Sequence, residues 1–154
     1  MQPKAFAVLA CLLAAVPVSL AAAPGDLDAG FGANGLVIVN INNQQSFPAG
    51  LAIQDDGKIV IGGTNGPVGA RDFMVIRGLP DATPDPAFGN NGVAVTPVGP
   101  GEDVARDIAV LPDGKILAVG STDLNGGFDV AFVRYHPDGS LDGTFGTGGI
   151  VIAP

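Results

Sequence analysis

Short apolar runs alternate along most of the chain with clusters of Gly, Pro, Asp and Asn. This pattern is typical of β-strands joined by tight turns, and none of the runs recurs with the period of an amphipathic helix. The sequence therefore predicts an all-β protein. The predicted strands span residues 35–41, 49–54, 58–63 and 72–79, and then residues 92–98, 107–111, 115–120 and 129–136.

Two of the predicted strands are apolar at consecutive rather than alternate positions, at residues 59–61 and 116–119. A strand with one solvated face alternates apolar and polar side chains, so a continuous apolar run indicates that both faces are buried. We therefore expect these strands to belong to sheets that are stacked between neighbours.

The apolar runs are part of an internal repeat, because Phe31, Phe88 and Phe145 each precede a glycine and are equally spaced along the chain. Residues 25–81 align with residues 82–138 without a gap, and 16 of the 57 aligned positions are identical. This part of the chain thus divides into unit 1 (25–81), unit 2 (82–138) and a partial unit 3 (139–154).

Four antiparallel strands in each unit favour two propeller-like blades, followed by the opening strand of a third blade. A β-sandwich formed by gene duplication is the alternative. A propeller typically needs at least about four blades to close. Because two blades leave broad faces uncovered, self-association is expected.

The N-terminal residues 1–22 have the features of a secretory signal peptide, with Lys4 before an apolar stretch and small residues at its end. The apolar stretch is interrupted by Pro17 and is too short to span a bilayer. The only cysteine, Cys11, lies in this segment, so the remaining domain, 23–154, would contain no disulfide. We expect this domain to be exported, to the periplasm or the extracellular space.

The chain is acidic, with a formal net charge of −8. Affinity for nucleic acid depends on Lys and Arg contacts with phosphate, so nucleic acid is not expected among the partners. After the signal peptide, the sequence contains no second apolar stretch long enough to span a membrane.

Asp-Gly pairs recur in the sequence, among them those at Asp56, Asp113 and Asp138. Asp bonds readily to local backbone and the following Gly adopts positive φ, so these pairs predict turns. Calcium ligation, the alternative, would require several oxygen atoms to converge on one ion. We assign no metal, cofactor-binding or catalytic residues.

A second set of recurring charges lies near the junctions between units. Asp85 and Asp142 each precede a Phe-Gly pair by three residues, as Asp28 does, while Arg77 and Arg134 lie towards the end of a predicted strand. We interpret them as acid–base pairs that join one unit to the next, with each Asp also accepting from backbone amides of the Phe-Gly turn.

The aromatic residues of the Phe-Gly pairs are expected to pack each unit onto its neighbour. The only histidine, His136, is predicted to be a solvated turn residue. Glu102 and Asp103, with Arg106 and Asp107 nearby, form an acidic cluster that unit 1 lacks. We expect a solvated loop there, and a cation site or an acid/base pair is the alternative.

Residues 28–35, 56–59, 111–116 and 133–142 resemble the delta-60 repeat family of bacterial extracytoplasmic repeats. The resemblance covers nearly the whole predicted exported chain and implies a propeller-like fold without assigning an activity. The linker at residues 78–85 departs from the pattern, because Ala82 and Pro84 stand where unit 2 has Gly139 and Leu141.

These features favour an exported, non-enzymatic β-repeat module that acts as a scaffold or binding surface for an unknown ligand. Two alternatives remain open. One is a secreted hydrolase or lyase with an axial metal site on a propeller, and the other is a truncated remnant of a longer repeat protein.

Overall fold

The computed structural model describes residues 23–124 and 126–153, so the predicted signal peptide and Cys11 lie outside the described residues. The described residues form two four-stranded antiparallel sheets and no helix. None of these residues therefore forms a helix that could cross a membrane. The first sheet contains β1 (Ser46–Ile53), β2 (Ile59–Asn65), β3 (Asp72–Gly78) and β4 (Val93–Thr96), and the second contains β5 (Asp103–Val110), β6 (Ile116–Asp123), β7 (Phe128–Tyr135) and β8 (Ile150–Ala153).

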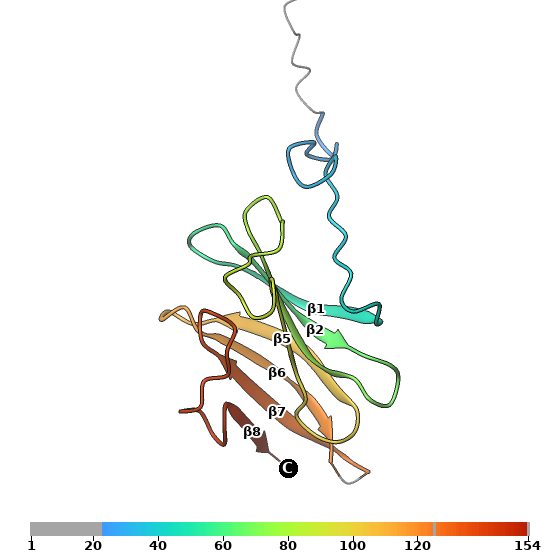
Figure 1. Cartoon of the computed structure of the whole chain (residues 1–154), viewed down its shortest axis with the longest axis vertical. Helices are drawn as coiled ribbons and strands as arrows, with labels where there is room; N and C mark the ends of the chain where they lie inside the picture. The colour runs from blue at the N-terminus through green and yellow to red at the C-terminus, as the bar shows by residue number, and fades with distance from the viewer. Residues whose placement is uncertain (1–22, 125, 154) are drawn as a thin grey trace, which may run out of the picture.

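Each sheet is a meander in which consecutive strands pair, and the two sheets lie face to face (Figure 1). The same irregularity occurs in both edge strands, since the register shifts between Pro48 and Gly50 in β1 and between Ala105 and Asp107 in β5. These positions are equivalent in the alignment of the two units, so the repeat is preserved even in its bulges.

The fourth strand of each sheet comes from the beginning of the next unit. Unit 1 supplies β1 to β3, and unit 2 supplies β4 before it begins the second sheet. The strand of the partial third unit, β8, completes the second sheet and does not open a third. The predicted strand at 35–41 is wrong, because these residues belong to no named strand. They are the repeat equivalents of β4, which pairs with the third strand of the preceding unit, and the described residues contain no such strand before them.

The main core lies between the two sheets. The face that the first sheet contributes to it is not the repeat equivalent of the face that the second sheet contributes. From the first sheet the core contains Val60, Phe73 and Val75, and from the second it contains Ala105, Ile108, Ile116, Ala118, Ala131, Val133 and Tyr135. Two glycines allow the sheets to approach, because a Cβ at Gly62 would overlap Ile108 and a Cβ at Gly120 would lie 2.8 Å from the Phe73 ring. The sheets therefore stack in the manner of successive blades.

The opposite face of each sheet is not fully covered. In β2, Val60 is buried whereas Ile59 and Ile61 are half-buried, and in β6, Ile116 is buried whereas Leu117 is half-buried. The prediction that both faces of these strands are buried is therefore wrong for the described chain, because only one neighbouring sheet is present.

Candidate functional site

The Asp-Gly pairs at Asp56 and Asp113 form the turns between the first two strands of each sheet, and the pair at Asp138 lies in the turn after β7, as predicted. The amide of Lys58 donates to Oδ1 of Asp56, and the amide of Lys115 donates to Oδ1 of Asp113, both at 3.2 Å. The intervening Gly57 adopts a φ of 80°, a conformation that glycine tolerates best. The Lys58 ammonium also binds Asp56 at 2.6 Å, and this hydrogen bond holds the pKa of the carboxyl below its usual range. These carboxylates are thus occupied by local turn contacts.

The predicted acid–base pair between units is present at Arg77 and Asp85. Nε of Arg77 lies 2.9 Å from Oδ2 of Asp85, and both side chains are buried. Asp85 also accepts from the amide of Ala87 at 2.9 Å. Burial alone would raise the pKa of Asp85, but the Ala87 amide and the Arg77 guanidinium together hold it below its usual range. The guanidinium further donates from Nη1 to the carbonyl of Pro137 in the second unit.

The equivalent pair in the second sheet is more open and carries an additional cation. Nε of Arg134 lies 2.8 Å from Oδ2 of Asp142, and Nζ of Lys115 lies 3.2 Å from the same oxygen. A hydrogen bond from the Thr144 hydroxyl, followed by these cations, holds the pKa of Asp142 well below its usual range. Each pair therefore fastens a fourth strand to the third strand of its sheet.

The phenylalanines of the Phe-Gly pairs differ in burial according to what lies beside them. Phe88 is fully buried between the units, with its ring 4.7 Å from the Arg77 guanidinium. Phe145 stacks on Arg134 at 4.4 Å but is only half-buried, as is Phe31. The expected packing role is confirmed for Phe88, where both units are present.

The prediction of a solvated loop at Glu102 and Asp103 is wrong. Glu102 is half-buried and binds Arg71 at 2.9 Å. Asp103 begins β5 and is fully buried, where it accepts from the Thr122 hydroxyl at 2.5 Å and from two backbone amides. Because the two amides belong to Val98 and Gly99, the carboxyl of Asp103 secures the 98–99 loop. Burial and the Asp103 charge together raise the pKa of Asp72.

The other predicted polar residues do not gather into one site. Arg106 and Asp107 are exposed on β5. His136 lies at the start of a turn, partly exposed, with Nε2 3.7 Å from Oδ1 of Asp142. Within 23–124 and 126–153, no three His, Cys, Asp or Glu side chains are placed to hold a metal ion.

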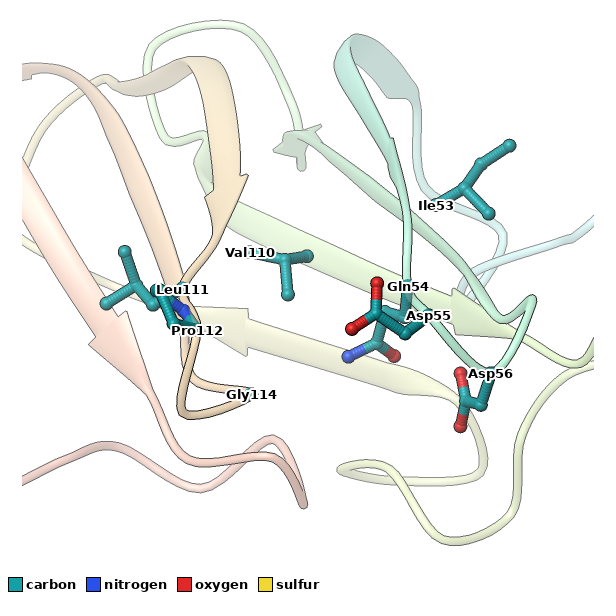
Figure 2. Close-up of a pocket in the computed structure, with 8 residues that line it drawn as sticks. All are labelled: Ile53, Gln54, Asp55, Asp56, Val110, Leu111, Pro112 and Gly114. Carbon is teal, nitrogen blue, oxygen red and sulfur yellow. The ribbon is translucent and has the colours of Figure 1, made fainter.

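A groove of about 400 Å³ lies between the first turns of the two sheets. Figure 2 shows Gln54, Asp55 and Asp56 on one side and Leu111 and Pro112 on the other. Oε1 of Gln54 is buried without a hydrogen-bond partner. The groove could accept a hydrogen-bond donor or a cation, although Asp56 is already paired with Lys58.

The most extensive feature without a local structural explanation is apolar. On the outer side of the first sheet, Leu51 is 63% exposed, whereas the equivalent residue of the second sheet, Ile108, is 9% exposed because the first sheet covers it. We call this surface the N-face and define it by Leu51, Ile53, Ile59, Ile61, Ile76 and Gly78. The outer side of the second sheet, the C-face, is defined by Leu117, Val119, Val130, Phe132 and Val151.

Residues 54–88 and 111–145 each match a family described as a domain of unknown function (DUF5122) beta-propeller, and the sequence has no significant match among curated proteins. The two matched segments occupy the same part of each unit, from the first turn of a sheet to the next Phe-Gly pair. Together, the two antiparallel sheets and the two matched segments fit a propeller-like family of β-repeats.

Proposed function

We propose that this protein is an exported, non-enzymatic scaffold of the delta-60 repeat type, which binds other proteins through the incompletely covered faces of its sheets. The exposure of Leu51 on the N-face carries the proposal, because the equivalent position of the second sheet is buried by a neighbouring sheet. Export is supported by the sequence features of residues 1–22.

The chemistry of the N-face favours a protein partner. Its side chains are aliphatic, from Leu51 and Ile53 to Ile61 and Ile76, and aliphatic surfaces of this kind are covered by other apolar surfaces. The net charge of −8 disfavours polyanions. The turn carboxylates Asp56 and Asp113 are each paired with the lysine two residues later, so they are already occupied within the chain.

A single thiol on the N-face tests this proposal in the setting where the protein acts. Cys11 is the only cysteine of the sequence and lies in the predicted signal peptide, so Ile53→Cys would supply the only thiol of the exported chain. Val68→Cys is the matched control, since Ile53 is 68% and Val68 is 76% exposed and Val68 lies outside both faces.

Both variants should react with a maleimide at similar rates when the purified proteins are dilute. After expression of the full chain in a Gram-negative bacterium, Ile53→Cys in the cell envelope or medium should react at least about tenfold more slowly than Val68→Cys. Equal rates in that setting would overturn the binding role, and retention of both variants in the cytoplasm would overturn export.

A further inference from the structure

We infer that the N-face of one copy binds the C-face of a second copy, in a head-to-tail arrangement that repeats the contact between the two sheets of one chain. This inference rests on the proposed function and names its partner. The two incompletely covered faces are unlike each other, and each is equivalent by the repeat to one side of the internal contact.

The equivalence can be followed position by position. Ile108 and Ile116, which the second sheet turns towards the first, are the repeat equivalents of Leu51 and Ile59 on the N-face. Val60, which the first sheet turns towards the second, is the repeat equivalent of Leu117 on the C-face. Each chain therefore presents one copy of each half of a contact that it already makes internally.

Residue exchanges at the two faces keep such a contact free of buried unpaired polar groups. In the internal contact, the buried hydroxyl of Tyr135 donates to the hydroxyl of Thr96 at 2.9 Å. The equivalent positions are Gly78 on the N-face and Ala153 beside the C-face, so both hydroxyls are absent together. The volume lost at Gly78 is offset on the C-face, where Phe132 stands in place of Val75. Val119 stands in place of Gly62, so the docked sheets approach less closely there than the internal ones. The facing residue, Leu51, lacks the Cγ2 atom of Ile108 that a Cβ at Gly62 would overlap.

The polar rim of the internal contact is also available at the N-face. In the internal contact, the amide of Gly89 donates to the carbonyl of Asp138 at 2.7 Å. Asp138 lies in a turn that is closed by a bond from the His136 amide to the Ser140 carbonyl. The equivalent turn of unit 1 is closed in the same way, with 2.8 Å between the Leu79 amide and the Thr83 carbonyl. A docked copy would therefore find matching acceptors in this turn.

One segment of the chain now lies over the N-face. Phe31, Val37 and Val39 line an apolar cavity of about 310 Å³ together with N-face side chains. By the repeat, residues 31–39 correspond to the segment that carries β4 and rests on the second sheet. They join no named strand, and Ile38 is exposed. In a docked copy, the equivalent segment is the one that carries β8, and it would occupy the position over the N-face that residues 31–39 now hold. Docking therefore displaces residues 31–39 from the N-face.

The test uses one charge on each face. Leu51→Asp places a carboxylate on the N-face, Val130→Asp places one on the C-face, and Val68→Asp is the control outside both. The native protein and Val68→Asp should associate at micromolar concentration in sedimentation velocity, while each face variant alone remains a monomer. An equimolar mixture of the two face variants should form a 1:1 dimer and nothing larger, because only one intact contact remains between them.

Three results would overturn the inference: a native protein that stays monomeric, a mixture that stays monomeric, or a Val130→Asp variant that associates like the native protein. Urea unfolding of the dilute variants checks that they fold. If Leu51→Asp or Val130→Asp does not fold, Leu51→Ser and Val130→Ser take the place of these two variants. If these experiments fail while Ile53→Cys remains protected in the cell envelope, the proposed function stands with a different protein as partner.

Discussion

The buried pair of Arg77 and Asp85 makes a quantitative prediction about stability. Replacing Arg77 with Met keeps the apolar stem but removes the 2.9 Å ion pair with Asp85, the bond to the Pro137 carbonyl and the contact with the Phe88 ring. Asp85 would then be a buried carboxylate without its cation. Breaking one side of a buried pair costs about 3 to 5 kcal/mol, so Arg77→Met should lower the free energy of unfolding by about that amount.

The assay is urea unfolding of dilute protein, followed by circular dichroism, with the slope m compared between variants. Arg134→Met is the matched control, because Asp142 keeps the Lys115 ammonium at 3.2 Å and the Thr144 hydroxyl when Arg134 is removed. It should lower stability by less than half as much as Arg77→Met.

A second substitution tests the cause of the loss. Asp85→Asn should destabilise the native protein but should stabilise Arg77→Met, because it then removes a charge that has no partner. The reasoning is refuted if Arg77→Met loses less than about 1 kcal/mol, if Arg134→Met loses as much, or if Asp85→Asn has the same sign in both backgrounds.

Three further predictions follow from other contacts. Gly62→Ala should cost about 1 to 3 kcal/mol, since its methyl would overlap Ile108, and clearly less in an Ile108→Ala background; equal costs in urea unfolding would contradict the close approach. Burial raises the pKa of Tyr135 to about 12, so the absorbance of this only tyrosine should titrate near pH 12 while the protein is folded, and a midpoint near pH 10 would be inconsistent with its burial. The raised pKa of Asp72 means that the fold favours its protonated form, so stability is lost as pH rises from 3.8 through the folded pKa. Asp72→Asn should therefore stabilise the protein at pH 7 and have little effect near pH 3; thermal unfolding at both pH values measures the difference.

Much of the local structure could be predicted because it depends on short stretches of sequence. The Asp-Gly turns at Asp56 and Asp113 follow from backbone preferences, and seven predicted strands overlap observed ones. The pairing of Arg77 with Asp85 was predictable because both residues recur at one offset. A recurring charge at a junction between units indicates a contact that every unit needs.

The phase of the blades could not be predicted from the repeat, because the length of a repeat does not determine where a sheet begins. The strand at 35–41 was therefore placed in a sheet of its own unit, whereas the fourth strands come from the following unit. The burial of Asp103 was missed for another reason. Its partners, Thr122 and the amides of Val98 and Gly99, are brought to it only by the fold, and unit 1 has Ser46 at the equivalent position.

The origin of each fourth strand has a consequence for dividing or extending the chain. A cut between units, after residue 81, would separate β3 from β4, leave the first sheet with three strands and expose the backbone groups of β3 that now pair with β4. A cut in the loop between Thr96 and Asp103 would instead leave both sheets whole. Insertions that lengthen the array should accordingly begin and end in this loop, so that every added piece carries its own closing strand.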